Sequence, residues 1–246
     1  MNLRAAFSWS YQLLEPDVSQ VFRLMGLVPG PHLSVTAAAS LAGVEPARMR
    51  SVLARLGEAF LIVEGPAGRY ARHALLHAYA RELAHLHDDE TQRRAAVRRL
   101  LDYYLHSAHA AALLLNPERN HVTLRPPADG VVQDGVDSRV GALQWFQAEH
   151  ANLIAAATHA TDTGFHGHAW QIAWTLWAYL DHRGQWQDVI TGDHTTVAMA
   201  PRLADTAAQA HAQRGLASVS IQLGSYDRTP TCLCDDAGDR RGAVAS

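Results

Sequence analysis

The sequence predicts a mainly α-helical chain that contains one small β-hairpin and continues into helical repeats. Apolar residues recur with a period near 3.6 along almost the whole chain, as in helices with one buried face. Strand-like alternation is confined to two short segments, residues 60–63 and 69–72. The chain has 246 residues, of which 48% are hydrophobic, and this is enough for one large core or two modest ones.

The first ninety residues begin with two helices that separate near Pro16. After a turn-rich segment, Ser34 is expected to cap a third helix, which stops at Gly43. Pro46 suits the first turn of the helix that follows. Two helices joined by a tight glycine turn are typical of a helix-turn-helix.

A hairpin and one further helix complete this part of the chain. The Gly-Pro-Ala-Gly sequence at residues 65–68 can close a hairpin, which would form a wing beside the helix-turn-helix. The segment that follows has helical periodicity. We therefore predict a winged-helix domain over residues 1–88.

Residues 89–138 are predicted to connect two domains through a long amphipathic helix and a loop. Acidic residues at positions 88–90 precede four arginines, the order that the helix dipole favours. These are Arg93, Arg94, Arg98 and Arg99. They form either a solvated stripe, which we favour, or a surface for an acidic partner or nucleic acid. Residues 116–138 are rich in Pro, Gly and Asp and are predicted to form a loop.

Residues 139–230 are predicted to form an incomplete array of helical-hairpin repeats. Similar turn triplets at Gly184 and Gly224 lie 40 residues apart, each after an apolar helix. We expect the tryptophans of this region to fill the core between hairpins rather than to line a ligand pocket. They are Trp170, Trp174, Trp177 and Trp186. Residues 231–246 have no helical apolar face, so we expect a disordered tail of the kind that truncation or a frame shift would leave.

Composition excludes several classes of function. All 21 basic residues are arginine, so a lysine Schiff base and the lysine of a phosphate-binding P-loop are both absent. No nucleophile or dinucleotide motif is present, and we predict no enzyme activity, no catalytic residues and no cofactor. No signal peptide or membrane-length apolar stretch is visible, and Cys232 and Cys234 are too close for an easy disulfide. These features favour a cytoplasmic protein without a membrane partner.

Two sets of residues are candidates for a site. His73 and His77 have the helical spacing of a metal pair, but neither the glutamate of a zinc protease motif nor a third ligand is evident, so no metal is expected. Arg48, Arg50 and Arg55 lie on the second helix of the helix-turn-helix and could contact DNA. Residues 1–90 hold eight Arg against nine Asp and Glu, which favours docking to another domain or a solvated face over DNA.

The strings "LARLGEAFLIVEGPAGRYARHALLHAYAREL" and "ALQWFQAEHANLIAAATHA" carry a resemblance to a known family. Over residues 5–228 the chain resembles STAND (NB-ARC type) transcriptional regulators of the actinobacterial antibiotic-regulatory AfsR/SARP-like group. The resemblance covers their winged helix and C-terminal tetratricopeptide (TPR) repeats. In that group a DNA-binding domain and an NTPase core precede this region.

The resemblance implies a role for His73. In the family a histidine of a His-Asp-Leu sequence approaches ADP in the NTPase core, and His73 matches it within "HAL". Ala74 replaces the aspartate, which implies a weaker orientation of His73. The implied function is a non-catalytic regulatory module that binds a protein partner through its repeats. A separate NTPase core would be a further partner, since this chain alone would bind neither ADP nor ATP. The alternative is a winged-helix DNA-binding regulator with a helical effector domain.

Overall fold

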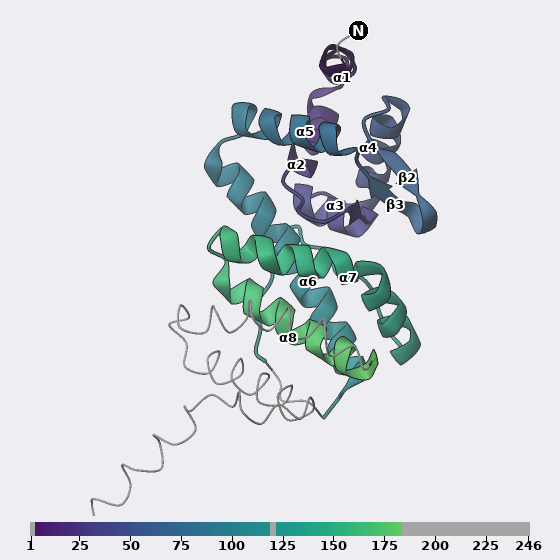
Figure 1. Ribbon diagram of the computed structural model, residues 1–246, viewed down its shortest axis with the longest axis vertical. Coiled ribbons are helices and arrows are strands. Elements are labelled where there is room, and N and C mark those ends of the chain that lie inside the picture. The colour runs from purple at the N-terminus through teal and green to yellow at the C-terminus, as the bar shows by residue number, and fades with distance from the viewer. Residues whose placement is uncertain (1–2, 119–121, 184–246) are drawn as a thin grey trace, which may run out of the picture. The chain divides into compact units, whose positions relative to one another are not determined.

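The computed structural model describes residues 3–118 and 122–183, and there the chain is mainly helical with one small antiparallel sheet, as predicted (Figure 1). The helices are α1 (Leu3–Gln12), α2 (Pro16–Met25), α3 (Val35–Ala42), α4 (Pro46–Glu58), α5 (Ala74–His87), α6 (Glu90–Leu115), α7 (Arg139–Asp162) and α8 (His166–Arg183). The strands are β1 (His32–Leu33), β2 (Val63–Gly65) and β3 (Arg69–Ala71), and a 3-10 turn, Pro66–Gly68, joins β2 to β3. The chain divides into two compact units, Met1–Tyr179 and Leu180–Ser246, and the first contains the sheet, helices α1 to α7 and most of α8.

The predicted ends of the third helix are confirmed. The Ser34 hydroxyl accepts a hydrogen bond from the backbone N–H of Ala37, which satisfies one donor that a helix start leaves unpaired. At the other end Gly43 has a φ of 70°, a left-handed conformation that a side chain would resist. The long helix α6 begins at Glu90 because Asp89 and Gln92 form a capping box in front of it.

The predicted hairpin is present, but its first strand lies later than expected. Strand β2 starts at Val63 because the turn that ends α4 continues through Phe60, whose φ is 58°. The N–H of Phe60 binds the carbonyl of Gly57, and the N–H of Leu61 binds that of Leu56, the pattern of a Schellman motif. Strand β1 was not predicted, since its two residues are too few to show alternation. It pairs with β3, so the sheet order is β1-β3-β2.

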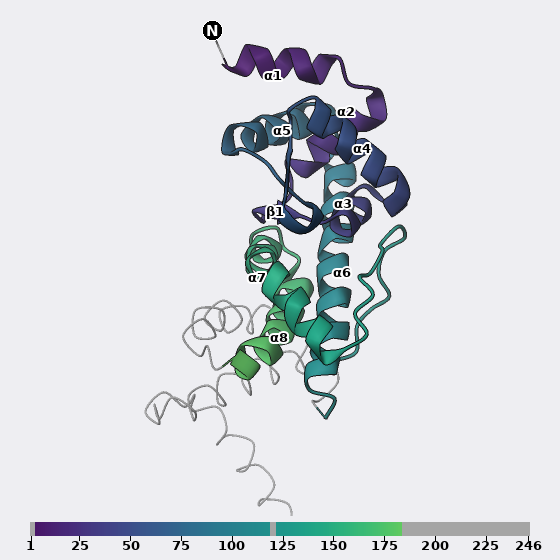
Figure 2. The same cartoon turned by 90° about the vertical axis from the view of Figure 1, so that its right-hand side faces the viewer.

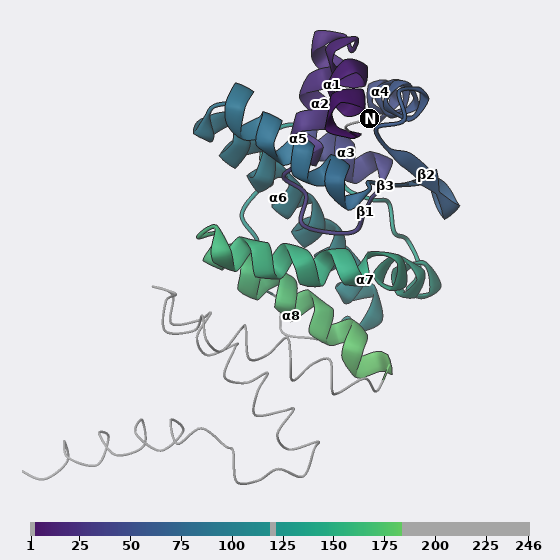
Figure 3. The same cartoon turned by 45° about the horizontal axis from the view of Figure 1, so that its top comes forward.

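Helices α2 to α5 pack together (Figure 3), and their buried side chains form a shared apolar core. Gly26, at the end of α2, lets that helix approach α5 closely, because a Cβ at this position would lie 2.3 Å from the backbone nitrogen of Arg81. Arg23 of α2 also binds Asp88 at the end of α5 through two hydrogen bonds, of 2.9 and 2.7 Å. The largest buried side chains of this core are Phe22, Met25, Leu33, Leu41, Met49, Leu53, Leu56 and Leu61.

Helix α6 leads from this group of elements to α7 and α8, and it contacts both α3 and α7 (Figure 2). Arg99 of α6 binds the end of α3: its Nε and Nη2 donate to the carbonyls of Ser40 and Leu41 at 3.1 and 2.8 Å. The last carbonyls of a helix have no partner within the helix and carry a partial negative charge. Arg99 therefore acts as a tertiary cap for α3.

Two other arginines of α6 bind helix ends in the same way. Arg93 donates to the carbonyls of Ala84 and Asp88 at the end of α5. Arg94 donates to the carbonyl of Thr163, which follows α7, at 3.3 Å. The prediction of a solvated stripe was therefore wrong for Arg93 and Arg99, which are half-buried against the ends of other helices, whereas Arg94 and Arg98 are exposed as predicted.

The loop between α6 and α7 packs against both α3 and α6. The Ser40 hydroxyl accepts from the N–H of Val132 at 2.9 Å and donates to its carbonyl at 3.2 Å. Gly130, whose φ is 83°, lies against Gly43, where a Cβ would come within 2.9 Å of the Gly43 Cα. Asp102 of α6 accepts from the N–H of Ala128 at 3.0 Å. The predicted loop is thus irregular in backbone but fixed by buried polar groups.

Helices α7 and α8 lie side by side (Figures 1 and 3) and are joined by a short turn that contains Gly164, where φ is 79°. Phe146 of α7 stacks on Tyr179 of α8 with ring centroids 5.1 Å apart. Trp170 is buried, and Trp174 stacks on His109 of α6, with 5.8 Å between ring centroids. The predicted turns at residues 184 and 224, Trp186, both cysteines and the tail at 231–246 lie outside the described residues. Among the described helices, none combines the length and the hydropathy of a membrane-spanning segment.

Candidate functional site

His73 lies between β3 and α5 and caps the start of that helix. Its Nδ1 accepts a hydrogen bond from the backbone N–H of Leu75 at 3.3 Å, and the side chain is exposed. Because Nδ1 is the acceptor, the neutral ring carries its proton on Nε2 and can donate from that atom. The imidazole itself thus makes the capping contact at a helix start where Ala74 offers no carboxylate.

His77 does not share the surroundings of His73. It is half-buried, and burial lowers its pKa first, followed by the nearby positive charge of Arg72. Within the described residues no group of three or more His, Cys, Asp or Glu side chains is placed to hold a metal ion.

The three α4 arginines are exposed, and acidic residues near the start of α2 bind two of them. Arg48 lies 3.2 Å from Asp17, and Arg55 binds both carboxylate oxygens of Glu15 at 2.5 and 2.6 Å. These hydrogen bonds lower the pKa of both carboxyls. Arg50 makes no ion pair or hydrogen bond with another described residue, so only one of the three presents an uncommitted charge to a ligand.

A buried polar contact, here called the sheet–α7 junction, joins the sheet to α7 through Arg69, Glu149, Asn152 and His32. Arg69 Nη1 lies 2.8 Å from Glu149 Oε1, and the Glu149 side chain is only 2% exposed. Asn152 donates to the other oxygen of Glu149 at 2.6 Å, and its own Oδ1 accepts from the backbone N–H of His32 at 3.4 Å. Burial would lower the pKa of Arg69, but the hydrogen bond and charge of Glu149 raise it above its usual value.

Asp134 of the α6–α7 loop gathers three elements at a single carboxylate. It accepts from the hydroxyls of Thr36 and Tyr103, both at 2.6 Å, and from Trp145 Nε1 at 2.7 Å. The three donors belong to α3, α6 and α7. A loop carboxylate therefore holds these helices together through neutral donors.

Arg72 is a buried charge without a carboxylate partner among the described residues. Its Nη2 lies 3.5 and 3.4 Å from the carbonyls of Val28 and Gly30, while Nε and Nη1 are buried and have no hydrogen-bond partner among the described residues. No acidic side chain of the described ranges pairs with it, and burial lowers its pKa to about 10. The tyrosine that interacts with it electrostatically is Tyr104, a fully buried residue of α6.

Sequence reasoning missed the junction, although a signal for it exists. Glu149 and Asn152 fall in the apolar stripe of α7 that contains Phe146 and Leu153, and a carboxylate there needs a partner when the stripe is buried. The partner, Arg69, comes from a strand 80 residues earlier in the chain, and sequence spacing gives no hint of that contact.

Comparison with known proteins finds two curated regulatory proteins. The chain is 32% identical to regulatory protein AfsR of Streptomyces griseus over 167 residues, which is 67% of this chain and 17% of that protein. It is 29% identical to AfsR of Streptomyces coelicolor over 234 residues, 92% of this chain and 23% of that protein. The chain thus spans about a fifth of the length of these relatives. No family model and no solved structure matches. The identities show that the chain is homologous to the AfsR regulatory proteins.

Proposed function

We propose that the chain is a non-catalytic regulatory module of the STAND (NB-ARC type) transcriptional regulators, made of a winged helix and TPR-like repeats. The homology to AfsR proteins is the observation that carries this proposal. The element order α2-β1-α3-α4-β2-β3 and the sheet order β1-β3-β2 support a winged helix, with α3 and α4 as its helix-turn-helix and residues 65–68 as its wing. The antiparallel α7 and α8, with aromatic contacts between them, support a repeat unit.

In this proposal the chain acts on a nucleotide-binding core. His73 would contribute its Nε2–H to a phosphate of ADP in that core. Its exposed position and the hydrogen bond at Nδ1 support this role, since together they leave Nε2 as the donor. The repeats would bind a protein partner in the cytoplasm, and the sheet–α7 junction would carry the effect of that binding to the winged helix.

The test is ADP release from the nucleotide-binding core of a STAND regulator, with and without the full chain. Fluorescent ADP should dissociate more slowly when the chain is present, and His73→Ala should restore fast release. His85→Ala, which removes an exposed histidine of the same helix α5, is the matched control. Equal release rates for the wild-type chain and the His73→Ala variant would remove the sensor role.

The second candidate function is DNA binding through α4, and Arg50 favours it because this exposed side chain has no acidic partner among the described residues. Glu15 and Asp17 oppose it, because they place negative charge beside Arg55 and Arg48, where phosphates would approach. A gel-shift titration with random DNA decides between the two. Affinity that falls steeply with salt and is weakened by Arg50→Met would support DNA binding.

A further inference from the structure

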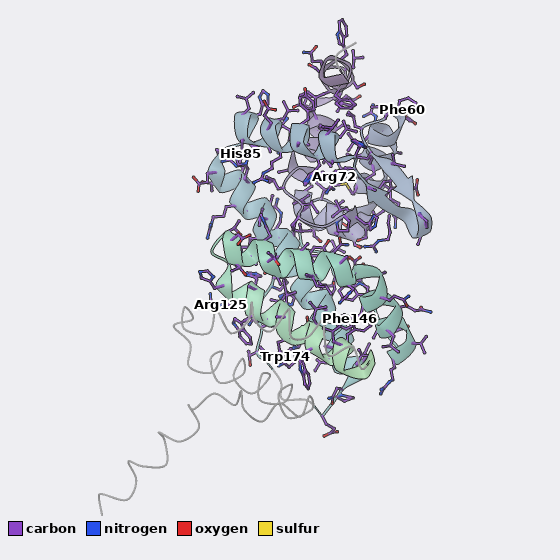
Figure 4. The ribbon with its side chains drawn as sticks, in the orientation of Figure 1. Phe60, Arg72, His85, Arg125, Phe146 and Trp174 are labelled. Atoms are coloured by element: carbon purple, nitrogen blue, oxygen red, sulfur yellow. The ribbon has the colours of Figure 1, made fainter. Side chains whose placement is uncertain are left out.

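Arg72 has surroundings that point to a ligand, whatever the outcome for the proposed function. Arg72 directly follows β3, and its side chain is directed into the fold, whereas Phe60, in the same group of elements, lies at an outer edge (Figure 4). A buried guanidinium usually has a carboxylate partner, because an isolated buried charge is costly. Arg72 has only two long contacts to backbone carbonyls within the described ranges.

Besides His77, whose Nε2 is also buried without a partner among the described residues, two further side chains around Arg72 have unused hydrogen-bonding groups. The Tyr104 hydroxyl is buried without a hydrogen-bond partner among the described residues, and it interacts electrostatically with both Arg69 and Arg72. Arg69 binds Glu149 through Nη1, but its Nε and Nη2 are buried and unpartnered within the same described region. These two nitrogens form one edge of the guanidinium, the edge that binds carboxylates and phosphates through two parallel hydrogen bonds.

Nearby carboxylates do not fill this role. Both oxygens of Glu149 are engaged, one by Arg69 and the other by Asn152. Asp134 is held by its three neutral donors and shows no interaction with Arg72. Four guanidinium nitrogens, two each from Arg69 and Arg72, and the hydroxyl of Tyr104 therefore remain as unused donors. No carboxylate of the described residues neutralises the positive charge of Arg72.

We propose that Arg72, Tyr104 and the Nε–Nη2 edge of Arg69 form a binding site for a small oxyanion of the phosphate or sulfate class. The anion supplies the counter-charge that Arg72 lacks and accepts hydrogen bonds from all three side chains. The site lies beneath the junction of the sheet with α6 and α7, so its occupation stabilises the contact between those elements. Arg69 and Arg72 each keep some exposure at other atoms, while their unpartnered nitrogens and the Tyr104 hydroxyl are buried.

The test uses the full chain and inorganic phosphate. Calorimetric titration and thermal unfolding are measured over a millimolar range of phosphate, with ionic strength held constant by chloride. We expect saturable binding and a rise in the unfolding temperature that saturates at the same phosphate concentration. In Tyr104→Phe, which removes one oxygen atom, phosphate should bind about tenfold more weakly, the effect of one lost hydrogen bond to a charged group.

Arg72→Met should abolish the saturable response and still fold, because replacing an unpaired buried charge by an apolar chain of similar length is tolerated well. Arg125→Met is the matched control: it removes an exposed arginine from the α6–α7 loop and should leave phosphate binding unchanged. Equal, non-saturating stabilisation of the wild type and Arg72→Met would show a general salt effect and overturn the proposal. Unchanged affinity in Tyr104→Phe would overturn it as well, even if Arg72→Met failed to fold.

Discussion

The arginines of α4 and those of α6 differ in what they bind, although both sets lie on amphipathic helices. On α4, Arg48 and Arg55 form exposed ion pairs with Asp17 of α2 and with Glu15 just before it, and both members of each pair keep substantial contact with water. On α6, Arg99 donates to backbone carbonyls at the end of α3 and is half-buried. Exposed ion pairs contribute little to stability, whereas hydrogen bonds to buried carbonyls are costly to lose. Burial of the acceptor, more than the number of charges, therefore decides how much an arginine contributes to the free energy of unfolding.

The sheet–α7 junction combines a buried acceptor with a charged pair, so its disruption should lower the free energy of unfolding more than the loss of any other arginine contact compared here. Glu149→Ala leaves Arg69 and Asn152 buried without their shared partner, and we expect a loss of about 3 kcal/mol in the free energy of unfolding. Urea unfolding followed by circular dichroism measures it. Glu58→Ala, which removes an exposed carboxylate of α4, is the control and should have almost no effect.

A double variant separates burial from pairing at the same junction. Arg69→Met combined with Glu149→Leu removes both charges and fills the space with apolar atoms. We expect it to recover most of the stability lost in Glu149→Ala, because the cost lies in the unpaired charge. A double variant that is as unstable as Glu149→Ala would mean that the ion pair itself holds the sheet against α7.

The difference between α6 and α4 is tested directly by Arg99→Met against Arg55→Met. Methionine keeps the apolar stem of arginine and removes the donors. Arg99→Met should lower the free energy of unfolding by about 1–2 kcal/mol, since two carbonyls at the end of α3 lose their partner. Arg55→Met should cause no measurable change. Equal losses in the two variants would contradict the role assigned to burial.

Much of the fold could be predicted from sequence, because its helix ends depend on local chemistry. Ser34 and Gly43 bound α3 through contacts within a few residues, and Pro46 marks the first turn of α4. The hairpin was predicted from its glycine turn. Its first strand was misplaced because Phe60 takes a left-handed conformation that sequence patterns assign to glycine or asparagine.

The candidate site was less predictable because its contacts are long-range. His73 was found through a family resemblance, and its capping hydrogen bond to Leu75 was not foreseen. Arg69 and Arg72 lie three residues apart, yet Arg69 pairs with Glu149 of α7 and Arg72 pairs with no carboxylate among the described residues. This difference depends on how α6 and α7 pack. The capping arginines of α6 looked like a solvated stripe for the same reason.

The comparison of buried with exposed arginines can be extended to histidine, whose side chain loses its charge near neutral pH. Burial lowers the pKa of His77, His106 and His159 below the ordinary value of 6.5. The unfolded chain therefore takes up protons at a higher pH than the folded chain, and the free energy of unfolding should fall as pH is lowered through 6.5 toward the folded-state pKa values. Thermal unfolding between about pH 7.5 and pH 5.5 measures the slope.

His77 is the member of this group to substitute, because two positive charges, those of Arg72 and Arg81, add repulsion to the effect of burial. His77→Gln should flatten the dependence of the unfolding temperature on pH. His85→Gln, on the exposed side of the same helix, should leave the dependence as it is in the wild type. Stability that rises as pH falls through this range would contradict the lowered pKa values of the buried histidines.

The smallest expected change in the free energy of unfolding is at Phe60, where the side chain is exposed and the strained backbone conformation determines the effect of a substitution. Phe60 is 87% exposed and sits at a φ of 58°, so its ring contributes little packing while its Cβ resists the conformation. Phe60→Gly should raise the free energy of unfolding by about 0.5–1 kcal/mol in urea denaturation, net of the extra freedom of the unfolded chain. Ala59→Gly, one residue earlier at a φ of −78°, makes the same replacement where no strain exists and should destabilise. If both variants lose stability, the prediction is contradicted. The Phe60 ring then makes a stabilising contact despite its exposure, and packing rather than backbone conformation determines the turn after α4.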